Sequence, residues 1–179
     1  MNEIIKQNGI KYGVMLGILG VLSQLTVYSI GGISEENSIL NTVIIMVFWI
    51  SYLLTRIIQS VNIKKDFGGF ISFKELFTSL TITITVGIII SQFFTFIFNN
   101  FIDIDYGIVM NNFMNEQQIL AKKAFKNFTN VSSSDLKEIA NTNNFSFVNI
   151  LQGTLFSFLI SSIMNILLAA IFKKNKPVF

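Results

Sequence analysis

This chain cannot carry out thiol or imidazole chemistry, because its 179 residues include no cysteine and no histidine. Disulfides, iron–sulfur clusters and the common haem and catalytic zinc ligands are therefore excluded. The charged residue in the most unusual place is Arg56, the only one well inside a long apolar run. An ionisable group at membrane depth marks a functional site by default. Because Arg56 lies near one end of its run, we expect it to snorkel to the headgroups, with binding of a substrate anion or a partner's acidic group as the alternative.

Polar side chains also occur inside the other apolar runs, at Gln24, Gln92, Asn165 and a threonine stripe over residues 78–85. They could line a solute path, but hydrogen bonds between helices, worth about 0.6 kcal/mol each, are the more frequent role. A small transporter or channel predicts one continuous polar line of Gln24, Gln92, Thr85 and Asn165 in a water-filled cavity. Away from their ends, these runs contain no acidic residue to carry protons.

Asp103 and Asp105 follow Asn99 and Asn100 and loosely resemble oxygen ligands for calcium. The spacing lacks the glycine and the distal glutamate of a calcium loop, which favours helix termination in a polar turn. We find no catalytic triad and no phosphate-binding loop, so we expect a non-enzymatic protein without cofactor or metal. The weakest alternative is an enzyme acting on lipid where Asp103, Asp105 and lysines converge.

The elements that must position these residues are four apolar runs, at about 12–33, 39–61, 73–100 and 148–172. A bilayer core about 30 Å thick requires about 20 mostly apolar residues as a helix, and each run is long enough. The chain is therefore expected to be all-α, a single polytopic membrane domain over residues 1–179. The first run is too long for a signal-peptide core and lacks a cleavage site, so we expect it to be retained.

The third run has a recognisable start. Ser72 and Glu75 have the spacing of a capping box, and Ile71 and Leu76 that of a hydrophobic staple. This pattern predicts that the third helix begins at Phe73 and that the preceding Gly68–Gly69 pair forms a turn.

Basic residues predict the orientation. Nine of them flank the spans on the side of the termini: Lys6, Lys11, Arg56, Lys64, Lys65, Lys74, Lys173, Lys174 and Lys176. The other four, Lys122, Lys123, Lys126 and Lys137, lie in the long segment 101–147. Both termini should therefore be cytoplasmic and segment 101–147 extracytoplasmic.

Segment 101–147 is predicted to form a helical hairpin. An amphipathic helix over about 106–128 is followed by a short one that Ser132–Asp135 caps and that ends at Ala140. Its apolar face provides a candidate interaction surface: Val109, Phe113, Leu120, Phe125 and Phe128. The asparagine-rich stretches are discounted, because a composition rich in Ile, Asn, Lys and Phe is what a nucleotide-biased genome produces.

Small residues recur on the first span at Gly9, Gly13, Gly17 and Gly20. Such G-x-x-x-G spacing lets helix backbones approach closely. A homodimer face is one interpretation, and packing against the second or fourth span of the same chain is the favoured one.

The segment Gly68–Phe77, with its G-G-x-I-S-F-x-x-x-F pattern, the outer stretch Asn112–Ala124 and the terminal Lys173–Lys174 together resemble the bacterial membrane family called domain of unknown function 4199. Leu76 departs from it, since relatives often have a small residue there. The resemblance implies a four-helix protein of the bacterial inner membrane and brings no known activity or catalytic residues.

The leading hypothesis is therefore an accessory or interaction protein of that membrane, which uses segment 106–141 on the membrane surface or on a partner. Expected partners are the lipid bilayer, another membrane or periplasmic protein, or a second copy of the chain. Nucleic acid is not expected, because the basic residues sit beside spans instead of forming a patch. The alternative is a small transporter or channel assembled as an oligomer.

Overall fold

The computed structural model describes residues 2–33, 37–124 and 132–175. Its helices are α1 (Glu3–Ser29), α2 (Ser38–Asp66), α3 (Phe73–Ile97), the π-helical turn η1 (Phe98–Ile102), α4 (Ile104–Ala124), α5 (Ser133–Ala140) and α6 (Phe147–Phe172). Helices α1, α2, α6 and α3 with its η1 extension are long and apolar enough to cross a membrane. The predicted all-α class with four such helices is confirmed.

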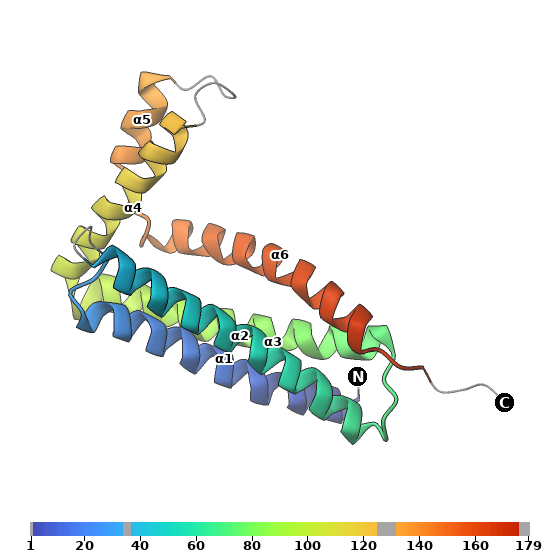
Figure 1. Ribbon diagram of the computed structural model, residues 1–179. Helices are drawn as coiled ribbons and strands as arrows, with labels where there is room; N and C mark the ends of the chain where they lie inside the picture. The colour runs from blue at the N-terminus through green and yellow to red at the C-terminus, as the bar shows by residue number, and fades with distance from the viewer. Residues whose placement is uncertain (1, 34–36, 125–131, 176–179) are drawn as a thin grey trace.

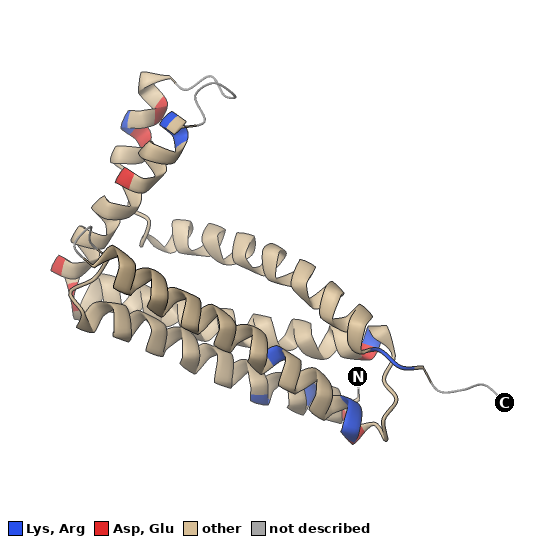
Figure 2. Cartoon of the chain, in the orientation of Figure 1, with Lys and Arg blue, Asp and Glu red and all other residues tan. Residues whose placement is uncertain are grey.

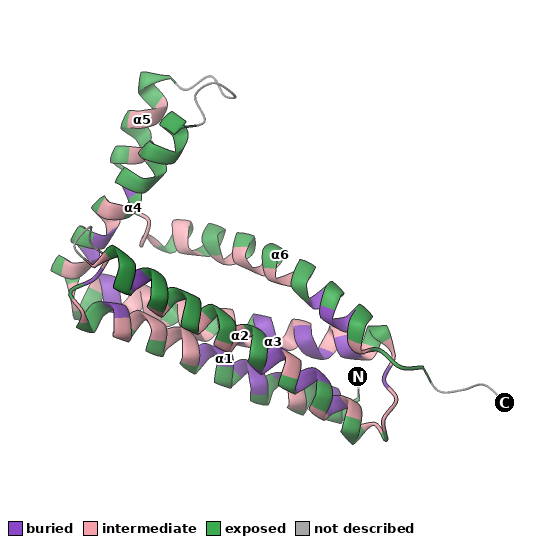
Figure 3. Ribbon diagram, in the orientation of Figure 1, coloured by how far each residue is buried: buried purple, intermediate pink, exposed green. Residues whose placement is uncertain are grey.

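The four long helices form a bundle in which α6 stands apart from the others along its first half, and α4 and α5 project from one end of this bundle, across its long axis (Figure 1). We call this the α4 end, and the opposite one, where α1 begins and α6 ends, the terminal end. Buried residues gather where α1 and α3 meet, whereas α2 and α6 are largely exposed (Figure 3). Their exposed side chains are mostly large and apolar, which suits contact with lipid.

The small residues of α1 pack against α3. A Cβ atom at Gly9 would lie 2.7 Å from the Cβ of Ile82, and one at Gly13 would lie 2.6 Å from the Cβ of Val86. Gly17 and Gly20 meet Ile90 and Ser91 in the same way. The stripe therefore packs within the chain, as favoured. Its main partner is the third span and not the second or fourth, and the second span contributes only at Gly20, where the Tyr52 hydroxyl lies 2.7 Å from the Cβ position.

The predicted start of α3 is present. The hydroxyl of Ser72 accepts a hydrogen bond from the backbone N–H of Glu75, and the Glu75 carboxylate accepts one from the N–H of Ser72 at 2.9 Å. Ile71 and Leu76 are buried in one apolar cluster. Gly68 and Gly69 have φ of 68° and 88°, as the predicted turn requires. Backbone hydrogen bonds of 2.9 Å in both directions tie Ile71 to Lys174 and close the terminal end.

At the α4 end, the third span changes to the π-helical turn η1 after Ile97 and stops at Asp103. The Asp103 carboxylate accepts hydrogen bonds from the backbone N–H of Tyr106, at 2.9 Å, and from the hydroxyl of Tyr28, at 2.8 Å. Asp103 therefore caps the beginning of α4 and ties it to α1. The third span ends at this polar turn, as expected.

Amide side chains hold α4 beside α5. Asn111 and Asn115 donate hydrogen bonds to the carbonyl of Thr142 at 3.0 and 2.9 Å. The amide of Asn144 donates to the side-chain oxygen of Asn115 at 2.6 Å. Discounting the asparagines was therefore wrong, since these ones fix how the two helices pack. Helix α5 begins after the N-cap Ser132, as predicted, and ends at Ala140.

Candidate functional site

Arg56 points into the bundle. Its side chain is only 8% exposed, and the guanidinium donates hydrogen bonds to the carbonyl of Ser161, at 2.9 Å, and to the side-chain oxygen of Asn165. The expectation that Arg56 snorkels to the headgroups is wrong. Residue 56 shares a buried face of α2 with Gln59 and Ser60, three and four positions on, and this face is turned toward the other helices.

Arg56 lacks a counter-ion in the described part of the chain. Glu75, the one acidic residue within the four apolar runs, caps the start of α3 at the terminal end, and the partners of the Arg56 guanidinium are two neutral oxygens. Its Nε atom is buried without a hydrogen-bond partner, as is the side-chain nitrogen of Asn165. Burying a cation and an N–H donor without full compensation is costly, so the site is electrostatically incomplete as it stands.

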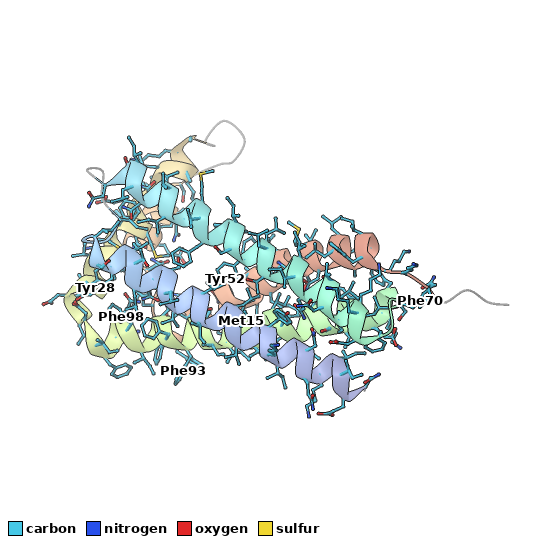
Figure 4. All side chains as sticks on the ribbon, turned by 60° about the horizontal axis from the view of Figure 1, so that its bottom comes forward. Met15, Tyr28, Tyr52, Phe70, Phe93 and Phe98 are labelled. Atoms are coloured by element: carbon cyan, nitrogen blue, oxygen red, sulfur yellow. The ribbon has the colours of Figure 1, made fainter. Side chains whose placement is uncertain are left out.

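A cavity of about 440 Å³ lies beside Arg56, between α2 and α6, and we call it the lateral cavity. Its lining residues are Ser23, Ile45, Phe48, Trp49, Tyr52, Arg56, Phe156, Ser157, Ile160 and Ser161. A smaller cavity of about 80 Å³ continues past Arg56 toward α3. Figure 4 shows Tyr52, which lines both, near the middle of the bundle.

A second cavity of about 390 Å³ adjoins the lateral cavity through Ser23, Ile45 and Tyr52 and extends toward the α4 end. We call it the roofed cavity, because Tyr106, Phe113 and other α4 side chains line it. Figure 4 places Tyr28 and Phe98 together at this end of the bundle. Burial, with smaller contributions from Tyr28 and Asp103, raises the pKa of Tyr106 above its ordinary value, so its hydroxyl stays protonated at neutral pH.

The structure brings the predicted polar residues together only in pairs. Gln24 and Gln92 both line the roofed cavity, and the hydroxyl of Thr95 donates to the Gln24 side chain at 2.9 Å. Asn165 instead holds Arg56, and Thr85 is exposed and donates to a carbonyl of its own helix. These side chains therefore do not form one continuous line.

The predicted interaction surface on α4 is divided. Val109 and Leu120 are 58% and 57% exposed, whereas Phe113 lines the roofed cavity. Phe125 and Phe128 lie outside the described residues. One part of this face therefore belongs to the cavity, and the rest is open to lipid or a partner.

A buried polar cluster that the sequence interpretation missed lies beyond Arg56 toward the terminal end. The amide of Gln59 donates to Thr83, at 2.7 Å, and lies 3.1 Å from oxygens of both Ser79 and Asn8. Gln59, Ser79 and Thr83 are fully buried. None of the three cavities around Arg56 is lined by Gln59, Ser79 or Thr83. A further cavity of about 620 Å³ lies at the terminal end, where Asn8 and Lys11 are among its lining residues. The available signal was Gln59 itself, three residues after Arg56 on one helix face.

Four membrane-length helices around a buried cation and its cavities define a multi-pass integral membrane protein. The chain belongs to the family described as protein of unknown function (DUF4199), whose model matches residues 11–174. No curated protein and no solved structure matches it.

Proposed function

We propose that the protein is a non-enzymatic binding protein of the bacterial inner membrane, which holds an anionic group of a ligand against Arg56. The observation that carries this proposal is a buried guanidinium with an unbonded Nε atom, on a residue that lines a cavity. A carboxylate or phosphate there supplies the missing charge and accepts from the free N–H, which is the interaction that arginine makes best.

In this proposal both termini are cytoplasmic and α4 and α5 are extracytoplasmic. The support is the charge distribution, because lysines concentrate around the terminal end of the bundle (Figure 2). These described lysines are Lys6, Lys11, Lys64, Lys65, Lys74, Lys173 and Lys174. The positive-inside rule assigns such an end to the cytoplasm.

Segment 106–141 keeps the accessory role that the sequence suggests. Helices α4 and α5 run across the bundle axis (Figure 1), so they lie along the membrane surface when the bundle spans the bilayer. Tyr106 and Phe113 of α4 line the roofed cavity, which adjoins the lateral cavity beside Arg56, while the exposed Val109 and Leu120 of α4 face the surroundings. An oligomeric transporter or channel has less support, because Gln24, Gln92, Thr85 and Asn165 do not form the continuous polar line that it predicts.

The proposal is tested by thermal unfolding of the purified full chain in a nonionic detergent. A ligand that binds only the folded state stabilises it by mass action, by about 2.7 kcal/mol at 100 times its dissociation constant. Undecanoate, acetate and inorganic phosphate serve as anion probes. At least one of them should raise the melting temperature of the wild type and of Lys11→Gln, but not of Arg56→Gln. The proposal fails if no probe does so, or if Arg56→Gln responds like the wild type.

A further inference from the structure

The lateral cavity has two chemically different parts. Its wall is made of large apolar side chains, among them Phe48, Trp49 and Phe156. Its polar groups are Arg56 and the hydroxyl residues Ser23, Tyr52, Ser157 and Ser161. Trp49 precedes Arg56 by seven residues, about 10 Å of helix axis, so the aromatic wall extends away from the cation toward the α4 end. A ligand that satisfies both parts has an anionic head and an apolar body.

The cavity opens sideways. Trp49 and Phe156, which line it from α2 and α6, are 69% and 66% exposed. In a membrane this opening faces acyl chains, because it lies between two spans and not at their ends. A ligand can therefore enter from the bilayer without passing through water.

The size of the cavity limits the occupant. About 440 Å³ is within the range of small-molecule sites. It does not admit a helix of a partner protein, which is about 10–12 Å across with its side chains. The cavity therefore fits one flexible chain better than a protein segment or the two chains of a phospholipid.

We propose that the lateral cavity binds a single-chain anionic amphiphile, with its carboxylate or phosphate head on Arg56 and its chain along Phe48, Trp49 and Phe156. This inference rests on the proposed function and adds the chemical class of the ligand. The head accepts hydrogen bonds from the guanidinium, including the Nε–H that now lacks a partner. The chain covers the aromatic wall that is otherwise exposed.

Trp49 is the only tryptophan of the chain and lines the cavity, so its fluorescence reports on the occupant. The probes are ω-bromoundecanoate and ω-bromoundecanol, which share a chain and a quenching bromine and differ in the charge of the head. In nonionic micelles, the acid should quench Trp49 saturably in the wild type. Arg56→Gln should weaken this quenching about tenfold or more, as expected for hydrogen bonds to a charged group, and leave quenching by the alcohol unchanged.

Two further variants separate the chain site from the charge. Ser157→Leu places a larger side chain in the cavity without altering Arg56, whereas Gly153→Leu adds one on the same helix where nothing lies within 4 Å of the Cβ position. Ser157→Leu should weaken quenching by the acid at least tenfold, and Gly153→Leu should leave it as in the wild type. This pair keeps the test valid if Arg56→Gln fails to fold.

Several results would overturn the inference. If acetate raises the melting temperature of the wild type as much as undecanoate does, the proposed function stands, but the ligand is not an amphiphile. If a brominated phosphatidylglycerol quenches Trp49 as strongly as the brominated acid does, and with the same dependence on Arg56, the ligand is not restricted to a single acyl chain. If acid and alcohol quench alike in the wild type and Arg56→Gln, and no anion shifts the melting temperature, the inference and the proposed function both fail.

Discussion

Arg56 on α2 and Asn165 on α6 face each other inside the bundle, and the guanidinium donates a hydrogen bond to the amide oxygen. Both side chains are buried, and each retains a nitrogen without a partner. The contact joins two helices that are otherwise largely exposed to the surroundings. It leaves one positive charge that the described part of the chain does not neutralise.

Replacing this amide by a carboxylate should occupy the anion site from within. Asn165→Asp supplies a charged acceptor next to Arg56, so we expect the unfolding free energy to rise by about 1.5–3 kcal/mol, the range for hydrogen bonds to charged groups. The gain in melting temperature on adding undecanoate should disappear. Asn175→Asp, with the same new charge at an exposed position beyond α6, is the control. An undecanoate response like that of the wild type in Asn165→Asp would contradict the assignment.

The close packing of α1 on α3 predicts a stability effect at Gly13. An added methyl group would meet the Val86 side chain at 2.6 Å, and overpacking of this kind costs about 1–3 kcal/mol. Gly13→Ala should therefore lower the unfolding free energy, measured by detergent-induced unfolding of the monomer. Gly153→Ala, at a position with open space, should not lower it. Dissociation of an oligomer by Gly13→Ala without loss of monomer stability would instead favour the homodimer face.

Orientation is open to a simple labelling test, because the chain has no cysteine. A single cysteine replaces either Lys65, at the terminal end of α2, or Lys123, near the end of α4. A membrane-impermeant maleimide applied to intact spheroplasts should label Lys123→Cys at once and Lys65→Cys only after lysis. The reverse pattern would place the termini outside the cytoplasm and α4 and α5 inside it.

Helix α5 should depend on pH through its cap. The Asp135 carboxylate accepts hydrogen bonds from the backbone N–H and the hydroxyl of Ser132. These bonds, the backbone one first, hold the pKa of Asp135 below its usual 3.8, and Lys122 lowers it by a smaller amount. A depressed pKa in the folded state means that the cap stabilises α5 above the usual value and that this stabilisation is lost as pH falls through the folded-state pKa.

Carbonyl NMR of Asp135 should therefore give a pKa below 3.8, and the protection of the α5 amides against exchange, corrected for the intrinsic pH dependence of exchange, should fall at lower pH. In Asp135→Asn, amide exchange should be fast already at neutral pH and should lose this acid transition. A measured pKa at or above the usual value would show that the carboxylate does not cap the helix.

Local sequence patterns were sufficient for the spans and for the start of α3, because the contacts between Ser72 and Glu75 form within one turn. The partner of the glycine stripe could not be derived in this way. G-x-x-x-G spacing indicates close approach, but which helix supplies Ile82 and Val86 depends on tertiary arrangement.

The direction of Arg56 was missed for a related reason. Snorkelling and inward packing differ in the rotation of α2 about its axis, which other helices determine. Gln59 and Ser60 on the same face carry that information, and polar residues three and four positions from an intramembrane charge argue for an inward direction. The role of the asparagines of α4 was missed because they were attributed to a nucleotide-biased composition, although their contacts with Thr142 and Asn144 are specific.

NMR of Arg56 shows directly whether an anion binds its guanidinium. It is the only arginine of the chain, so its Nε–H gives a single resonance in a sample labelled with ¹⁵N-arginine. We predict that undecanoate shifts this resonance saturably, because its carboxylate provides the acceptor that Nε lacks, and that undecanol does not. No shift with any anion, or the same shift with undecanol, would contradict the account.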